Sequence, residues 1–177
     1  MRNGVLHAAN FHDNATTYCL GHTMNDADPR SPPRQPLRVL LLDDDSFTLE
    51  VMADMLATIG NFDIRCETDA RRALATLAGE RPALLICDLS MPDMDGIEFM
   101  QAAAEAGFQG SVMLLSGMDP GVRRSAERLA RAHGLKVLGA WQKPISAIDL
   151  RSALAALAAD DGRGDENLYN PTTHVGK

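Results

Sequence analysis

The sequence has little of several features that mark particular classes of protein. Aromatic residues make up only 5% of its 177 residues, so a folded core must consist mainly of aliphatic side chains. No apolar run reaches the roughly 18–20 residues that a membrane-spanning helix needs. The formal net charge is −7, which is unfavourable for holding nucleic acid by neutralising phosphates. These absences argue against a membrane protein and against a protein that binds nucleic acid directly.

Cysteine is also scarce. Cys19, Cys66 and Cys87 cannot all pair with one another, and the last two lie in apolar segments of strand length. Reduced thiols in a reducing compartment are the simpler interpretation. The N-terminus has no apolar stretch of the kind that a secretory signal contains. We therefore expect a cytoplasmic protein.

Composition changes divide the chain into three parts. Hydrophobic residues make up 45% and charged residues 23%, a balance typical of globular proteins. Residues 1–36 show no sustained periodicity and end in a proline-rich stretch, so we predict a disordered leader. Residues 37–159 are predicted to form the folded domain. Residues 160–177 are polar and are predicted to be a flexible tail or a truncated linker.

Two kinds of segment alternate along residues 37–159. Apolar runs of strand length occur at Leu37–Leu42, Phe62–Cys66, Ala83–Cys87, Val112–Leu115 and Lys136–Gly139. Segments with helical character lie between and after them, at Ser46–Ile59, Asp69–Ala78, Ile97–Ala106, Val122–His133 and Ala147–Ala159. Five strand–helix repeats with short loops predict an α/β fold, a five-stranded parallel sheet with helices on both faces.

Residues that favour helix ends support these boundaries. Side chains that cap helix N-termini are found at Asp45 or Ser46, at Asp69 and at Ser146. Glycines fall where four of the helices should end, at Gly60, Gly79, Gly107 and Gly134.

Polar side chains follow four of the five predicted strands. Asp43, Asp44 and Asp45 follow the first, Asp88 the third, Ser116 the fourth and Lys143 the fifth, a few residues on. Ligands of open parallel sheets bind outside the carboxyl ends of the strands. We therefore expect several carboxylates, a hydroxyl and an ammonium group to converge there.

This set of groups suits phosphoryl chemistry. Clustered carboxylates repel one another, and a hard cation such as Mg²⁺ removes the conflict by binding their oxygens. A carboxylate can also be the nucleophile that forms an aspartyl-phosphate. Lysine and hydroxyl groups then stabilise the charge on the phosphoryl oxygens. Each member also has a plainer interpretation, since aspartates cap helices and Asp88 could simply open a turn. Their shared position at strand ends favours a common site.

The order Asp43-Asp44, Asp88, Ser116, Lys143-Pro144 resembles the receiver domain of two-component response regulators. The loop Leu89-Ser90-Met91-Pro92-Asp93-Met94-Asp95-Gly96 is similar to the family's loop after its phosphoacceptor. The resemblance covers about residues 37–159 and implies a flavodoxin-like (βα)5 fold. It implies a signalling switch, not an enzyme, that a histidine kinase or phosphotransfer protein phosphorylates. A homodimer is compatible with it.

The resemblance also implies a role for each matching residue. Asp88 is the phosphoacceptor, and Asp43, Asp44 and Asp88 belong to the Mg²⁺ site together with the backbone carbonyl of Ser90. Ser116 is the switch hydroxyl that moves toward the phosphoryl group. Lys143 contacts a phosphoryl oxygen, and the Lys143-Pro144 bond is expected to be cis. Phosphorylation would then move the loops that follow the fourth and fifth strands, and the helix Val122–His133.

Two features depart from the family pattern. Receivers carry Tyr or Phe three residues before the motif lysine, where this chain has Ala140, with Trp141 displaced by one. The segment between Ser116 and Lys143 is longer than in most receivers, and from Val122 onward, including the helix Val122–His133, it carries five basic residues against a single acid, Glu127: Arg123, Arg124, Arg128, Arg131 and Lys136. It could be an ordinary solvated face or a docking face for an acidic downstream partner. Residues 115–140 are most similar to receivers attached to EAL-type cyclic-di-GMP phosphodiesterase domains.

Two other functions remain open at this stage. A degenerate receiver would act as an interaction module without phosphorylation, and the missing aromatic residue at Ala140 keeps this possibility open. A haloacid-dehalogenase-type phosphatase would use Asp43 as its nucleophile and Asp45 as the second acid of its motif. That scheme fits less well because it expects Thr or Val where Phe47 stands and has no role for Asp88.

Overall fold

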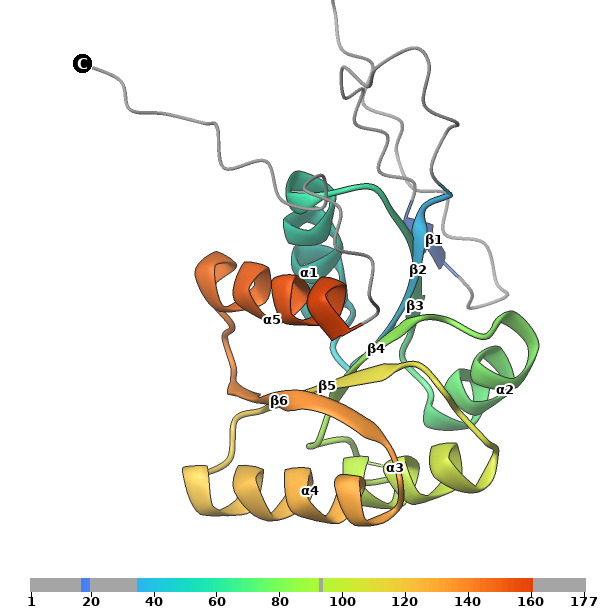
Figure 1. Cartoon of the computed structure of the whole chain (residues 1–177), viewed down its shortest axis with the longest axis vertical. Coiled ribbons are helices and arrows are strands. Elements are labelled where there is room, and N and C mark those ends of the chain that lie inside the picture. Colours follow the sequence, from blue (N-terminus) through green and yellow to red (C-terminus); the bar gives the residue numbers. More distant parts are fainter. Residues whose placement is uncertain (1–16, 20–34, 93, 161–177) are drawn as a thin grey trace, which may run out of the picture.

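A computed structural model describes residues 17–19, 35–92 and 94–160 of the chain (Figure 1). Five parallel strands form most of the sheet: β2 (Leu37–Leu42), β3 (Phe62–Glu67), β4 (Leu84–Asp88), β5 (Ser111–Ser116) and β6 (Lys136–Gln142). They alternate with α1 (Ser46–Ile59), α2 (Ala70–Glu80), α3 (Gly96–Glu105), α4 (Pro120–Ala132) and α5 (Ala147–Asp160). The predicted alternation is confirmed, and every boundary except the end of β6 lies within two residues of its predicted place.

The strand order is β3-β2-β4-β5-β6, with all neighbours in this series parallel. This is the flavodoxin-like order that the resemblance implied. The central strand β4 is buried along its whole length, as is β5, because helices cover both faces of the sheet. Such strands must be almost continuously apolar, as their sequences are.

The N-terminal part differs from the prediction in one respect. Residues 1–36 were expected to be a disordered leader, but Thr17–Cys19 forms β1, which pairs antiparallel with β3 at the edge of the sheet. An edge strand presents backbone N–H and C=O groups that can pair with any extended segment. The rest of the leader up to residue 34, and the tail after residue 160, lie outside the described residues.

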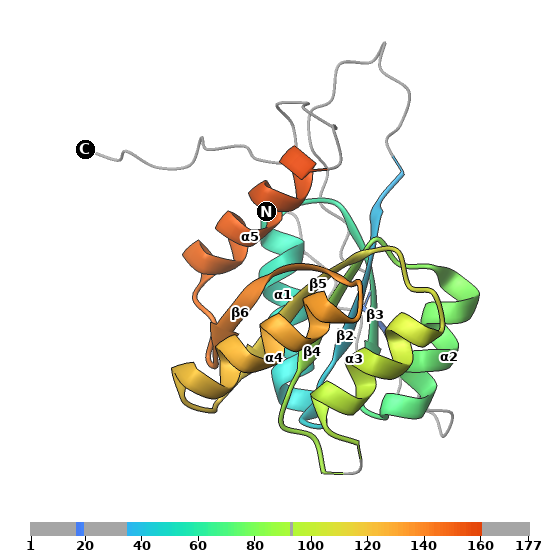
Figure 2. The same ribbon diagram turned by 60° about the horizontal axis from the view of Figure 1, so that its bottom comes forward.

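The helices form two layers (Figures 1 and 2). α1 and α5 lie on one face of the sheet, and α2, α3 and α4 lie on the other. Buried side chains divide accordingly into two clusters. The α1/α5 cluster includes Leu49, Leu56, Leu115, Leu150 and Leu154. The α2/α3/α4 cluster includes Leu77, Phe99, Leu114, Ala126 and Ala130.

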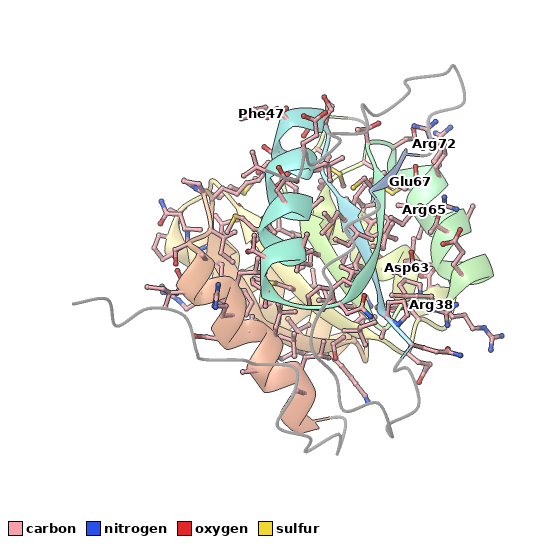
Figure 3. The ribbon with its side chains drawn as sticks, turned by 90° about the horizontal axis from the view of Figure 1, so that it is seen from above. Arg38, Phe47, Asp63, Arg65, Glu67 and Arg72 are labelled. Atoms are coloured by element: carbon pink, nitrogen blue, oxygen red, sulfur yellow. The ribbon has the colours of Figure 1, made fainter. Side chains whose placement is uncertain are left out.

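Strand β3 carries charged side chains on its α2 side (Figure 3). Arg65 forms an ion pair with Glu80 of α2. Glu67 is 2% exposed, with its carboxylate 3.5 Å from Arg72 Nε and accepting a hydrogen bond from the Thr76 hydroxyl at 3.3 Å. Burial raises the pKa of Glu67. Ion pairs therefore help hold α2 against this edge of the sheet.

The helix ends mostly follow the sequence signals. Asp45 and Asp69 cap α1 and α2 through hydrogen bonds from Phe47 N and Arg72 N, and the Ser146 hydroxyl accepts one from Asp149 N at 3.1 Å. Gly60 ends α1, while Gly107 and Gly134 follow α3 and α4 with positive φ. The prediction for Gly79 is wrong, because α2 continues through Glu80 and ends at Arg81, directly before Pro82.

Within the described ranges, no helix is both long enough and apolar enough to cross a membrane.

Candidate functional site

The predicted site residues lie at the carboxyl ends of neighbouring strands. Asp43 directly follows β2, Asp88 is the last residue of β4, Ser116 is the last residue of β5, and Lys143 directly follows β6. These strands are adjacent and parallel in the order β2-β4-β5-β6. The sheet therefore brings residues that are up to 100 positions apart to one edge.

Three carboxylates form the centre of the site. Oxygen atoms of Asp43, Asp44 and Asp88 all lie within 4.8 Å of one another. Asp43 and Asp88 are each 2% exposed, whereas Asp44 is open to solvent. Negative charges this close and this poorly hydrated repel each other unless a cation lies among them. The donor set consists of carboxylate oxygens, which hard divalent cations such as Mg²⁺ prefer.

Lys143 supplies one cation from the chain itself. Its Nζ lies 2.5 Å from Asp43 Oδ2 and 2.9 Å from Asp88 Oδ2. Partial burial alone would lower the pKa of Lys143, but hydrogen bonds to the two carboxylates outweigh that effect and raise the pKa. The lysine is therefore held as a charged ammonium that bridges the two buried acids.

Asp43 shows the opposite balance. Burial raises the pKa of Asp43. Hydrogen bonds from Lys143 and from Asp45 N, the latter at 3.1 Å, lower the pKa, but the effect of burial is larger. Its backbone is fixed by a hydrogen bond from Asp43 N to the Glu67 carbonyl, at 3.3 Å. Sequence reasoning had found no functional group after the second strand. The missed contribution is a backbone carbonyl, which no side-chain pattern reveals.

Asp45, the third aspartate of the run, is a helix cap and not part of the cluster. Its carboxylate accepts hydrogen bonds from Phe47 N and from the Thr48 hydroxyl, both at 3.0 Å. The Thr48 hydrogen bond, followed by the one from Phe47 N, lowers the pKa of Asp45. For this residue the plainer interpretation, helix capping, is correct.

The loop after Asp88 is held close to the strand ends. Leu89 N donates to the Leu115 carbonyl at 2.9 Å, and Ser90 N donates to Asp88 Oδ1 at 3.1 Å. The role of the Ser90 carbonyl as a metal ligand stays a prediction. Gly96 packs so tightly that a Cβ there would lie 2.5 Å from Leu89 Cα and 2.8 Å from the Asp88 carbonyl oxygen. Glycine at position 96 thus allows α3 to begin directly against the Asp88 loop.

Cys87 precedes Asp88 in β4 and is completely buried. Its thiol lies 3.0 Å from the Asp88 carbonyl oxygen. Burial raises the pKa of Cys87 well above its usual value, so the group stays a neutral thiol beside the acids. Cys66 is buried as well.

Ser116 lies on the strand next to Asp88 and is fully buried. Its hydroxyl accepts a hydrogen bond from Met118 N at 3.0 Å, and its carbonyl accepts one from Lys143 N at 3.0 Å. The ends of β5 and β6 are therefore linked where the serine and the lysine stand. The Lys143-Pro144 peptide bond is cis, as expected.

This fold, with an acidic cluster and a bridging lysine at the strand ends, defines a receiver-like signalling domain. The family model described as the response regulator receiver domain matches residues 39–155. The chain belongs to the response regulator receiver family. The function class predicted from the sequence is thereby confirmed, whereas the roles of individual residues stay predictions.

Curated proteins with similar sequences include cyclic di-GMP phosphodiesterase RocR of Pseudomonas aeruginosa, 34% identical over 111 residues. That match covers 62% of this chain and 28% of RocR. Response regulator MprA of Mycolicibacterium vanbaalenii is 28% identical over 134 residues, which cover 73% of this chain and 55% of MprA. The matches thus span only 28% and 55% of these two relatives' lengths.

Solved structures agree. A response regulator from Colwellia psychrerythraea is 36% identical, with a TM-score of 0.61, and the match covers 71% of this chain and 99% of that one. A CheY-like receiver domain protein from Methanospirillum hungatei is 21% identical, with a TM-score of 0.63 over 73% of this chain and all of that one. At this lower identity the second likeness supports the fold alone.

Proposed function

We propose that the chain is a switch in which Asp88 accepts a phosphoryl group from a histidine kinase or a phosphotransfer protein. The observation that carries this proposal is the placement of Asp88. It ends the central strand β4, with Lys143 Nζ 2.9 Å from one carboxylate oxygen and with Asp43 and Asp44 beside it. A nucleophilic carboxylate with a cation at hand suits phosphoryl transfer.

The reaction balances without any further reactant. A carboxylate oxygen of Asp88 attacks the phosphorus of phosphohistidine, an O–P bond forms and the N–P bond breaks. The imidazole leaves as a neutral base because its other ring nitrogen carries a proton taken up from water, and the product is an acyl phosphate. Lys143 remains charged throughout, which its raised pKa favours, and it stabilises negative charge on a phosphoryl oxygen.

We propose that Asp43, Asp44, Asp88 and the Ser90 carbonyl hold Mg²⁺. When bound, Mg²⁺ supplies positive charge to the carboxylates and to the incoming phosphoryl oxygens. The donors fit this ion because they are oxygens, with two carboxylates buried and a third open to solvent.

The readout of phosphorylation begins at Ser116 and Lys143. A phosphoryl group on Asp88 adds negative charge beside the Lys143 ammonium and offers acceptors to the Ser116 hydroxyl. The Ser116 hydroxyl accepts a hydrogen bond from Met118 N, so a swing of this hydroxyl toward the phosphoryl group would also shift the loop before α4. This is a local change of charge that biases the conformation of a loop.

A downstream partner with acidic side chains would fit the exposed face of α4. Arg124, Arg128 and Arg131 lie on one side of the helix and are all exposed. Among the described residues, the ion pair formed by these arginines lies within α4 itself, between Arg131 and the Glu127 carboxylate at 2.9 Å. The positive charge near Arg124 and Arg128 thus stands out on a chain of net charge −7.

We propose a cytoplasmic location, where a buried thiol such as that of Cys87 stays reduced. Phosphoryl acceptance on Asp88 makes it a switch and not a phosphatase that uses Asp43. Phosphoryl acceptance also distinguishes the protein from a receiver that works without phosphorylation.

Acetyl phosphate with Mg²⁺, followed by intact-protein mass measurement, tests the proposal. We expect one phosphoryl adduct that hydroxylamine removes. The adduct should be absent in Asp88→Asn, and absent from the wild type when EDTA removes Mg²⁺. The matched control is Asp54→Asn, an exposed aspartate on α1. An adduct that persists in Asp88→Asn would refute the assignment. No adduct at all would favour the unphosphorylated module, and turnover of phosphate esters lost only in Asp43→Asn would favour the phosphatase.

A further inference from the structure

Strand β6 contains an irregularity that changes which way its side chains point. Val112 of β5 pairs with Val137, but the next residue, Met113, pairs with Gly139. One extra residue, Leu138, therefore bulges out of the β6 register. A bulge of this kind shifts the alternation of all later side chains by one position relative to an unbroken strand.

The bulge decides where the residues before Lys143 lie. Ala140 pairs with Leu114 and packs against the α2/α3/α4 cluster. Trp141 pairs with Leu115 and packs against the α1/α5 cluster, on the opposite face of the sheet. The only tryptophan of the chain thus does not take the place of the aromatic residue missing at position 140. It contributes its ring to the other layer.

Gly139 makes room for that ring. A Cβ at position 139 would lie 2.9 Å from Trp141 Cη2 and 3.1 Å from Cζ3. The indole therefore lies back along β6 over the glycine, instead of projecting freely into solvent. The ring is partly buried and packs against the α1/α5 cluster, to which α5 contributes Leu150 and Leu154, and α5 itself contacts β6.

The same stretch of β6 is connected to the acidic site. Trp141 is two residues from Lys143, which bridges Asp43 and Asp88. Lys143 N also donates to the Ser116 carbonyl, so both switch residues are attached to the end of this strand. We expect a displacement of Lys143 toward a new anion to move the end of β6, two residues from Trp141.

We propose that Trp141 transmits occupancy of the Asp88 site to α5, on the α1/α5 face of the sheet. The inference rests on the proposed function. On the α4 side, position 140 contributes only a methyl group to the cluster that contains Ala126 and Ala130. On the α5 side, a large rigid ring lies between the strand and the helix.

Hydrogen exchange of the full chain with and without beryllofluoride and Mg²⁺, a non-covalent analogue of the phosphoryl group, tests this inference. We expect exchange to change in the Asp88 and Ser116 loops and in α5. In Trp141→Ala the loop changes should remain and the α5 change should be lost. Trp141→Phe, which keeps a ring, should restore it. A purely structural role would alter the basal exchange of α5 without removing its response.

Gly139→Ala provides a second variant that keeps the tryptophan but displaces its ring. It should also reduce the α5 response, and it keeps the test valid if Trp141→Ala does not fold. The inference is overturned if α5 responds equally in all variants, or if α5 of the wild type does not respond while the Asp88 and Ser116 loops do. If the Asp88 and Ser116 loops show no response, the proposed function itself fails, and the inference fails with it.

Discussion

Lys143 gives the most direct test of how the acidic cluster is held together. Its ammonium contacts Asp43 Oδ2 at 2.5 Å and Asp88 Oδ2 at 2.9 Å, and both acids have side chains that are 3% exposed. Lys143→Ala removes this cation, and the buried carboxylates of Asp43 and Asp88 then lie close to each other and to Asp44 with no ammonium between them. We therefore expect the substitution to destabilise the metal-free protein.

The size of the effect follows from burial. Removing one partner of a fully buried ion pair costs about 3–5 kcal/mol. The Lys143 side chain is 24% exposed, so water reaches part of the pair and the cost should be smaller. Asp43, whose pKa burial already raises, can also take up a proton and limit the loss. We expect a loss of about 2–3 kcal/mol, which lowers Tm by roughly 6–12 °C in a domain of this size.

Urea denaturation at pH 7 in EDTA measures this loss. The matched control is Lys136→Ala, an exposed lysine at the start of the same strand, which should cost less than about 0.5 kcal/mol. Added Mg²⁺ should restore part of the stability of Lys143→Ala, because a ligand that binds only the folded state stabilises it. A Lys143→Ala variant as stable as the wild type would show that the carboxylates do not depend on this ammonium.

Three further predictions concern the surroundings of the site. Asp43→Asn should stabilise the metal-free protein at pH 7, because the raised pKa of Asp43 means that its ionised form is disfavoured by folding. When the free energy of unfolding is measured at a series of pH values, this gain should shrink as pH falls through the raised pKa that Asp43 has in the folded protein toward its usual value of 3.8. Gly96→Ala should cost about 2–4 kcal/mol because its Cβ would lie 2.5 Å from Leu89 Cα, whereas Gly117→Ala, with open space around it, should cost far less. Asp119→Ala should cost about 1 kcal/mol in thermal unfolding, because Asp119 caps α4.

Each of these predictions has a contradictory result. Asp43→Asn that is less stable than the wild type at pH 7 would mean that its ion pair outweighs its burial. Equal stability of Gly96→Ala and Gly117→Ala would show that the approach of α3 to the Asp88 loop is looser than the structure indicates. An Asp119→Ala variant with unchanged Tm would show that water replaces the cap without loss.

The repeating pattern of the chain was sufficient to predict the elements and the site. Buried parallel strands must be apolar throughout and helices need polar caps, so both leave a clear signal in sequence. The convergence of Asp43, Asp88 and Lys143 followed from one rule, that the carboxyl ends of parallel strands share an edge. The strand order, in contrast, came from family resemblance, because periodicity does not specify which strands are neighbours.

Features that depend on register or close contact could not be predicted in this way. The bulge at Leu138 moves Trp141 to the opposite face from the one that an unbroken strand would give it, and the sequence carries no mark of it. The edge strand β1 forms because β3 offers free backbone groups, which is a property of the assembled sheet. Asp45 looks like its neighbours Asp43 and Asp44 in sequence, and only the position of α1 makes it a cap.

The central claim is that Asp43 and Asp44 gather a divalent cation beside Asp88 so that Asp88 can carry a phosphoryl group. A crystal structure of the protein with Mg²⁺ and beryllofluoride tests it most directly. The account predicts beryllium bonded to a carboxylate oxygen of Asp88, Mg²⁺ bound by Asp44 and Asp88, and Lys143 Nζ in contact with a fluoride. Beryllofluoride bonded to Asp43, or Mg²⁺ bound away from these carboxylates, would contradict it.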